Sequence, residues 1–257
     1  MKRITITVVA LFFAMALPAQ DAESIVRAAR NRIQADTVST RSRMVITAAN
    51  GSTAERVIDQ YSKDDEQGND RMMIVFQSPA SVKNTRFLTL DRSSGDSDRW
   101  IFVPSLGKVR RIAASDSGSN FMGTDFSYDD MSSMSRDAGR DTHTLLREEN
   151  LNGTACHVVQ SVPKDRDFQY SRMISWIGKE NSVIYQVEMY DRRGALQKVM
   201  ESGALEDVQG HLTPTQTTVR TLAAGTSTTI HMDIIKYDDP IPDTVFTAAY
   251  LETGRLR

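Results

Sequence analysis

Three aspartates are the residues of this chain whose spacing could support acid–base or metal chemistry. Asp125, Asp129 and Asp130 lie close together in the stretch FMGTDFSYDDM. A calcium loop needs oxygen donors at alternate positions, a glycine at its sixth position and a closing glutamate, and this stretch lacks that glycine and that glutamate. Ser127 and Asp130 instead have the spacing of a capping box. We therefore expect a short helical turn here, with aspartates that cap it and contact solvent.

The histidines have no spacing typical of a catalytic or metal site. They are His143, His157, His211 and His231. No HExxH motif, zinc-type pairing of Cys with His, GxSxG elbow or glycine-rich phosphate loop is present. The sequence thus favours a protein that is not an enzyme and needs no metal or cofactor. A hydrolase that uses Asp125 or Asp129 with a histidine such as His143 stays open as an alternative.

Lys108, Arg110 and Arg111 form a basic group in the stretch WIFVPSLGKVRRI. Guanidinium groups bind phosphate and carboxylate through paired hydrogen bonds, so these residues could contact the head group of an anionic ligand. The alternatives are a partner protein and a solvated hairpin edge. The chain as a whole has a net charge of −2 and lacks the basic excess of a nucleic-acid-binding protein.

The N-terminus has the pattern of a secretory signal peptide. Met1-Lys2-Arg3 precedes an apolar run from Ile4 to Leu17, and Pro18-Ala19 follows. A membrane-spanning helix needs roughly 20 apolar residues, so we expect cleavage near Ala19, with residues 1–19 as signal peptide and residues 20–257 as a single domain. The one cysteine, Cys156, can form no internal disulfide and is expected to be a small buried residue.

A helix followed by many short strands is the predicted architecture. Helical spacing of apolar residues covers 21–33, and β-favouring runs dominate afterwards. The runs are STRSRMVITA, AERVIDQYSK, DRMMIVFQSP, TRFLTLDR, DRWIFVPS, GKVRRIA, ACHVVQSV, SRMISWIG, SVIYQVEMYD, LQKVMES, TPTQTTVRTL and TSTTIHMDIIKY. Turn residues at 50–51, 152–153, 178–181, 191–194 and 223–225 favour antiparallel hairpins between neighbours.

Two of these strands are apolar on both faces, which predicts one face against an outer cover and one against an interior. They are MMIVF at 72–76 and WIFV at 100–103. The segment from Ala113 to Asp141 interrupts the strands, and irregular segments of this length are usually functional or disordered. Abundant methionine suits a surface that adapts to flexible apolar chains.

The blocks WIFVPSLGKVRRI and FMGTDFSYDDM, with the C-terminal PIPDTVFTAAYL, make the chain resemble the outer-membrane lipoprotein-sorting proteins of the LolA-like superfamily. The likeness is to the longer, poorly characterised branch and covers essentially the whole chain after residue 19. It implies an incomplete antiparallel β-barrel, with helices that plug or cover an apolar cavity. It also implies a periplasmic carrier of the acyl chains of lipoproteins or other lipids. A second hypothesis is a non-enzymatic accessory module that docks on an inner-membrane lipid exporter or envelope complex, with the barrel as a scaffold.

Such a carrier would receive its cargo from an inner-membrane donor and release it to an outer-membrane acceptor. The side chains expected to bind acyl chains are Met44, Met72, Ile74, Phe76, Phe87, Trp100, Phe102, Met173, Trp176 and Met189. Those expected to form a rim or lid are Phe121, Met122, Phe126, Tyr128, Met131 and Met134.

Overall fold

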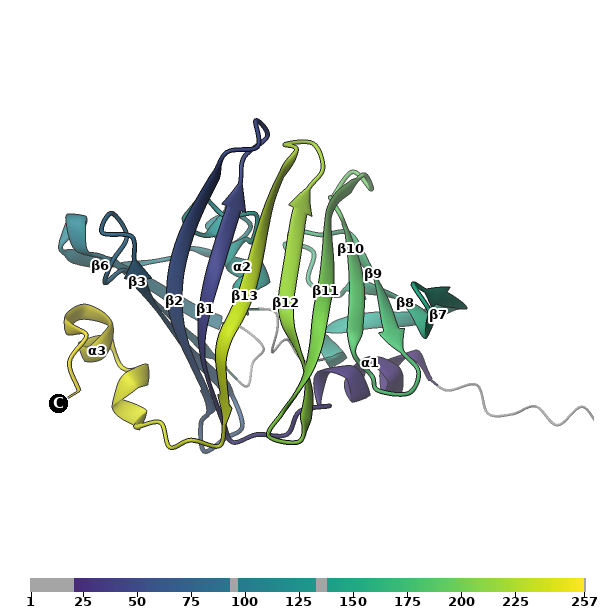
Figure 1. The fold of residues 1–257 in the computed structure, drawn as a ribbon, viewed down its shortest axis with the longest axis horizontal. Coiled ribbons are helices and arrows are strands. Elements are labelled where there is room, and N and C mark those ends of the chain that lie inside the picture. The colour runs from purple at the N-terminus through teal and green to yellow at the C-terminus, as the bar shows by residue number, and fades with distance from the viewer. Residues whose placement is uncertain (1–20, 93–96, 133–137, 257) are drawn as a thin grey trace, which may run out of the picture.

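Thirteen antiparallel strands form one curved, open sheet in the part of the chain that the structure describes (Figure 1). The computed structural model describes residues 21–92, 97–132 and 138–256. In the first half the strands are β1 (Thr37–Thr47), β2 (Thr53–Asp64), β3 (Asp70–Ser78), β4 (Arg86–Asp91), β5 (Ser97–Val103) and β6 (Lys108–Arg111). In the second half they are β7 (Asp141–Leu151), β8 (Thr154–Pro163), β9 (Arg172–Gly178), β10 (Ile184–Tyr190), β11 (Leu196–Val208), β12 (His211–Thr221) and β13 (Thr226–Tyr237). The predicted open, mainly β fold is confirmed.

The order of the strands explains why one connection must cross the sheet. The sheet runs β6-β5-β4-β3-β2-β1-β13-β12-β11-β10-β9-β8-β7. The first and last strands pair in its middle, where Met44 lies opposite Ile230, and all other neighbours follow each other in the chain. The two free edges, β6 and β7, are therefore consecutive in sequence. The connection between them has to run from one edge to the other. We call its described parts, residues 112–132 and 138–140, the crossing loop.

The predicted turns join neighbouring antiparallel strands as expected. Asn152 and Gly153, for example, both have positive φ and connect β7 to β8. Twelve of the strands coincide with predicted runs, and β7 was missed. Its sequence, DTHTLLREENL, does not alternate apolar and polar residues, and it has an irregular register between Leu145 and Arg147. An edge strand of this kind carries little of the pattern by which buried strands are recognised.

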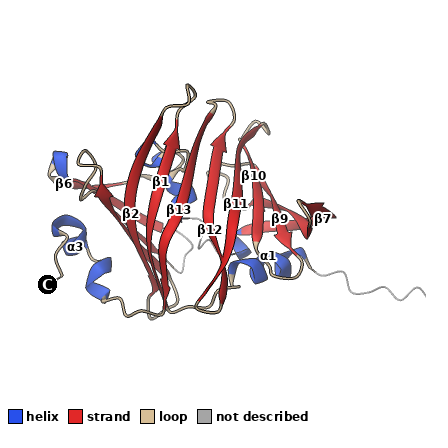
Figure 2. Ribbon diagram, in the orientation of Figure 1, coloured by secondary structure: helices blue, strands red, loops and turns tan. Residues whose placement is uncertain are grey.

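The helices are few and lie beside the sheet (Figure 2). α1 (Ala22–Arg30) is shorter than predicted, and the Asp21 carboxylate accepts the backbone N–H of Glu23 at its start. α2 (Tyr128–Ser132) belongs to the crossing loop, and α3 (Ala248–Thr253) follows a 3-10 turn, η6 (Asp243–Phe246). None of the helices in the described residues has the length and apolar character needed to cross a membrane. The predicted signal peptide lies outside the described residues.

The two faces of the sheet are both covered along β3, β4 and β5, as the apolar runs predicted. On the outer face, Met73 and Leu88 pack against Ile241, Phe246 and Leu251 of the C-terminal segment. Arg86 fixes that segment by donating to the carbonyl oxygens of Leu251 (2.6 Å) and Glu252 (2.8 Å). On the inner face the alternate residues of the same strands pack against the crossing loop.

Candidate functional site

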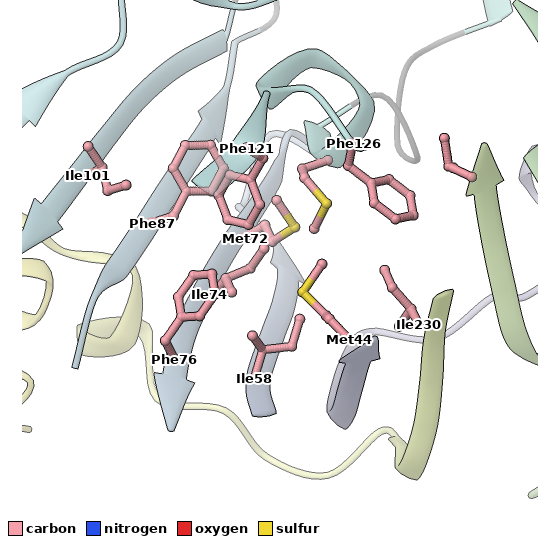
Figure 3. Packing of buried hydrophobic residues seen from close by; sticks show 12 residues of the cluster. Met44, Ile58, Met72, Ile74, Phe76, Phe87, Ile101, Phe121, Phe126 and Ile230 are labelled. Atoms are coloured by element: carbon pink, nitrogen blue, oxygen red, sulfur yellow. The ribbon is translucent and has the colours of Figure 1, made fainter. Parts of the chain in front are cut away.

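The inner face of the sheet carries a large cluster of buried apolar side chains, which we call the inner cluster (Figure 3). Alternation along the strands brings them together, because residues two apart point to the same face. Its members from the sheet are Met44, Ile58, Met72, Ile74, Phe76, Phe87, Ile101, Val219 and Ile230. Met44, Ile74, Phe76 and Phe87 are fully buried. The cluster thus joins strands from both halves of the chain.

The apolar surface continues along the inner face beyond this cluster. Met200 contacts both the inner cluster and a second group that contains Phe168, Tyr170, Val187 and Met189. Ile184 in turn contacts this second group and the cluster under α1, where Val159 and Ile177 meet Ile25 and Val26. Apolar side chains therefore line the inner face without a break from β5 to β8.

Three side chains of the crossing loop fill the space against the inner cluster. Phe121, Phe126 and Met131 are each no more than 3 % exposed. The Phe121 ring lies 5.2 Å from that of Phe87 and 5.8 Å from that of Phe76, measured between ring centres. These tilted geometries are the favourable ones for aromatic pairs. These three of the six residues expected to form a rim or lid thus belong to the interior itself.

Asp125 fixes the crossing loop to β12 and β13. One carboxylate oxygen accepts the hydroxyls of Thr221 (2.6 Å) and Thr226, and the other accepts that of Thr228 (2.8 Å). The backbone N–H of Asp125 donates to the Thr228 oxygen at 2.9 Å. The carboxylate is only 3 % exposed, so hydroxyl groups replace the water that it would otherwise bind.

Asp130 joins the predicted capping box to a buried lysine. The backbone N–H of Ser127 donates to its carboxylate (2.8 Å), and its own N–H donates to the Ser127 hydroxyl (2.9 Å). This reciprocal pair confirms the capping box and starts α2. The same carboxylate accepts Lys198 Nζ (3.0 Å) and the Tyr170 hydroxyl (2.9 Å). Burial and the negative charge of Asp130 raise the pKa of Tyr170 far above its ordinary value.

Asp129 provides a third attachment of the loop, to β5. It lies 3.0 Å from a guanidinium nitrogen of Arg99 and accepts the hydroxyl of Ser117 at 2.8 Å. The side chains of Arg99 and Asp129 are largely buried. The expectation that Asp125 and Asp129 are solvated loop residues is therefore wrong, because both are buried and bound to partners on the sheet or within the loop.

Arg56 is an inner-face residue that the sequence did not suggest. It lies opposite Met44 on β2 and donates to the carbonyl oxygen of Met122 in the crossing loop. Its guanidinium also lies 5.9 Å from the centre of the Phe76 ring. Burial lowers the pKa of Arg56, whose charge is half removed from water. Only its position opposite an apolar residue could have indicated that it faces inward.

Seven of the ten residues predicted to bind acyl chains lie on the inner face. They are Met44, Met72, Ile74, Phe76, Phe87, Met173 and Met189. Trp100 and Phe102 lie on the opposite face, where they pack beneath the C-terminal segment. Trp176 is also on the outer face, beside Cys156 and Val158, and its indole N–H donates to Glu149. These three do not line the interior.

The other three residues predicted to form a rim or lid are Met122, Tyr128 and Met134. Met122 and Tyr128 pack at the margin of the inner cluster as partly buried side chains. Met134 lies outside the described residues. Burial raises the pKa of the Tyr128 phenol, while the nearby Arg110 has the opposite effect.

The three basic residues of β6 do not share a face. Arg110 lies opposite the inner-face residue Ile101, whereas Arg111 lies opposite Trp100 on the outer face. Arg111 pairs there with the largely buried carboxylate of Asp98 at 2.5 Å. Lys108, two residues from Arg110, is on the inner side. A single head group therefore cannot contact all three in the same way.

His143, the histidine suggested as a partner for Asp125 or Asp129, is bound to other groups. The ring nitrogens of His143 lie 2.8 Å from the Ser161 hydroxyl and 2.8 Å from the Ala138 carbonyl oxygen. Both are thus engaged away from Asp125 and Asp129. Within the described residues, no three histidine, cysteine, aspartate or glutamate side chains are arranged to hold a metal ion.

Comparison with known proteins gives the chain a family and several structural relatives. A family model described as that of an uncharacterized protein matches residues 68–253. No curated protein matches the chain significantly.

Solved structures are similar along nearly the whole chain. A DUF1329 family protein from Desulfovibrio piger is 27 % identical with a TM-score of 0.86, covering 90 % of this chain and 97 % of that protein. A domain described as an outer membrane lipoprotein-sorting protein domain, from Vibrio parahaemolyticus, is 23 % identical with a TM-score of 0.84 over 90 % and 98 % of the two chains. A LolA superfamily protein from Nitrosomonas europaea is 24 % identical with a TM-score of 0.72 over 90 % and 100 %.

Proposed function

Because this chain belongs to the family of uncharacterized proteins whose model matches residues 68–253, and has a LolA-like fold, we propose that it carries the acyl chains of lipids or lipoproteins. The observation that supports this most is the unbroken apolar inner face, which reaches from the inner cluster through Met200 and Ile184 to α1. A long acyl chain needs an extended apolar surface of this kind rather than a small pocket.

The energetic need for such a carrier is large. Moving a 16-carbon chain from a membrane into water costs on the order of 12 kcal/mol, at about 0.8 kcal/mol per methylene group. Binding against a protein surface that excludes water removes most of this cost. The process needs no nucleophile, metal or cofactor, since no covalent bond changes. It needs an acceptor that binds the cargo better than the carrier does.

In this proposal the crossing loop and the acyl chain compete for the same surface. Phe121, Phe126 and Met131 contact the inner cluster where a cargo chain would lie. The loop would leave this surface as cargo enters and return as cargo leaves. The residues that bind the acyl chains are then Met44, Met72, Ile74, Phe76, Phe87, Met173 and Met189, together with Ile58, Ile101, Val219 and Ile230.

The location and partners follow from the same proposal. A signal peptide in residues 1–19 would direct the protein across the inner membrane into the periplasm. An inner-membrane transporter would supply the cargo and an outer-membrane acceptor would receive it. The similarity to a domain described as lipoprotein-sorting supports this route.

A disulfide that locks the crossing loop tests the proposal directly. Asp125 and Thr228 are in side-chain contact at 2.8 Å, so the double variant Asp125→Cys/Thr228→Cys should bring two thiols together. Cys156 is fully buried and would not interfere. The oxidised variant should fail to bind a fluorescent 16-carbon fatty acid, and reduction should restore binding at least to the wild-type level.

The reduced form of the same variant is the matched control, because it differs only in the cross-link. Equal binding by the oxidised and reduced forms would show that loop displacement is not needed. Lipid extraction of protein purified from its native host, followed by mass spectrometry, should in addition recover stoichiometric lipid. Its consistent absence, together with no binding of the fatty acid, would refute the carrier proposal.

One observation favours the second candidate, a non-enzymatic module that docks on an inner-membrane lipid exporter or envelope complex. Phe121 and Phe126 already fill the inner face, which would suit a scaffold with a permanent core. The two candidates differ in the locking experiment. With the Asp125→Cys/Thr228→Cys disulfide formed, a scaffold would still bind its partner protein, whereas a carrier would no longer bind the fatty acid.

A further inference from the structure

The free edge of β6 presents backbone groups that no described residue binds. The N–H of Ile112, directly after β6, donates to the carbonyl oxygen of Arg99 at 2.9 Å. Hydrogen-bonded and non-bonded pairs alternate in an antiparallel ladder, so Lys108 and Arg110 bond to β5 through their backbone groups. The N–H and C=O groups of Val109 and Arg111 therefore point away from the sheet.

The side chains along this edge are basic on both faces. Lys108 and Arg110 lie on the inner side, both are exposed, and neither has an ion-pair partner among the described residues. Arg111 lies on the outer side and pairs with Asp98. A strand added to β6 would thus pass between positive charges above and below it.

The opposite edge of the sheet differs in each of these respects. The register of β7 is irregular between Leu145 and Arg147, which interrupts a regular ladder. Its carboxylates are also engaged, since Glu148 pairs with Lys179 at 2.7 Å and Glu149 with Arg147 at 2.6 Å. β6 is therefore the edge with both regular backbone groups and unpaired charge.

We propose that β6 is a docking edge that takes up an extended, acidic segment of a partner protein as an additional antiparallel or parallel strand. Backbone hydrogen bonds to Val109 and Arg111 would provide affinity, and Lys108 and Arg110 would select carboxylates. This rests on the proposed function in one respect: Arg110 lies opposite Ile101 of the inner cluster, so a partner bound here would stand next to the surface that cargo enters.

Nuclear magnetic resonance with a peptide probe tests this mode of binding. A short peptide that alternates glutamate and threonine should shift the amide signals of β6 in the ¹⁵N-labelled protein. The amides of Val109 and Arg111 should gain protection from hydrogen exchange in the complex, because they become ladder donors. A peptide with lysine in place of glutamate should not bind.

Charge and backbone variants separate specific docking from general attraction. Lys108→Glu/Arg110→Glu should weaken peptide binding at least about tenfold. The control Lys83→Glu/Arg193→Glu makes the same change in net charge at exposed residues elsewhere and should leave binding unchanged. Val109→Pro removes an outward amide while sparing the bonds to β5, and should abolish binding in a protein that remains folded by circular dichroism.

Several outcomes would overturn the proposal. Basic residues on an edge strand also discourage aggregation, and a purely protective role predicts no peptide binding or no protection of Val109 and Arg111. Binding of phosphatidylglycerol vesicles instead of the peptide, or self-association through β6, would likewise contradict it. Fatty-acid binding by Lys108→Glu/Arg110→Glu is measured in parallel. This variant should lose the peptide but keep the fatty acid, so failure of the docking proposal can be told apart from failure of the carrier proposal.

Discussion

α1 and the crossing loop both cover part of the inner face of the sheet, and different contacts hold them there. α1 packs mainly through the small or apolar side chains of Ala22, Ile25, Val26 and Ala29, and its last residue, Arg30, lies 3.7 Å from the buried carboxylate of Asp141 on β7. The crossing loop combines apolar contacts with the buried carboxylates of Asp125 and Asp129 and the partly buried one of Asp130. Their partners are the threonines of β12 and β13, Arg99 of β5, and Lys198 of β11.

This difference indicates which of the two segments would detach from the sheet as a unit. An apolar contact weakens gradually as two surfaces separate. A buried charge that loses its partner is left without solvation, which is costly until water reaches it. If the crossing loop is displaced, as the carrier proposal requires, we therefore expect it to be released fully into water rather than shifted in part. α1 depends more on apolar contacts, with Arg30 and Asp141 as its pair of this kind, so we expect it to be less bound to such an all-or-none release.

Lys198→Ala should have the largest effect on the crossing loop. It leaves the Asp130 carboxylate buried beside Tyr170 without its cation, and breaking a buried pair in this way costs about 3–5 kcal/mol. Urea unfolding should show this loss, and hydrogen exchange should show that residues 121–131 open while α1 stays protected.

The double variant Lys198→Met/Asp130→Asn is the control for this change. It removes both charges and keeps a side chain that can bond to Ser127, so it should be more stable than Lys198→Ala alone. A loss below about 1 kcal/mol in the single variant would mean that the ion pair does not hold the loop.

Ile25→Ala should have the next largest effect, and on the other segment. The side chain is 3 % exposed and packs with Val159 and Ile177. Removing it should lower the free energy of unfolding by about 2–4 kcal/mol. Hydrogen exchange should become faster in α1 and stay unchanged in residues 121–131. Faster exchange in both segments would show that they are coupled, contrary to the comparison.

Asp125→Asn should have a smaller effect, again on the loop. An amide keeps one acceptor oxygen for Thr221 and Thr226 but loses the negative charge that strengthens these bonds. A loss of about 1–3 kcal/mol is expected, together with faster uptake of the fluorescent fatty acid. Thr218→Val removes a neutral hydroxyl bond to Thr229 and should leave uptake unchanged.

The smallest expected effect is a pH dependence in the half of the sheet that carries α1. Burial, with a smaller contribution from Lys179, lowers the pKa of His157 below its ordinary value of 6.5. Between these two values the unfolded chain binds a proton that the folded chain does not, so stability decreases as the pH falls below 6.5. In His157→Gln, the free energy of unfolding measured with urea should depend less on pH below 6.5. An unchanged pH dependence would mean that other groups cause it.

The comparison of the two segments also shows how far prediction from sequence could go. The capping box of Ser127 and Asp130 was predictable because its two residues are three apart. Lys198 was not, because it is 68 residues from Asp130 in the chain and meets it only when β11 lies across the inner face. The same holds for Asp125 and its threonines on β12 and β13.

The faces of the aromatic residues show a second limit. The pattern WIFV at 100–103 indicated that both faces of β5 are apolar. It could not indicate that Ile101 faces the interior while Trp100 and Phe102 lie under the C-terminal segment. That choice depends on a cover supplied by residues more than 130 positions away.

The sequence by itself determined twelve of the strands, the turns between neighbours and the short helical turn of the crossing loop, because these depend on residues close together in the chain. Only the tertiary structure decided which face is the interior and what fills it. Pairing of β1 with β13 makes β6 and β7 the two edges of the sheet. The crossing loop then has to connect these edges, and its packing places it on the inner face. There Asp125 and Asp129 are buried against strands that the sequence places far from them.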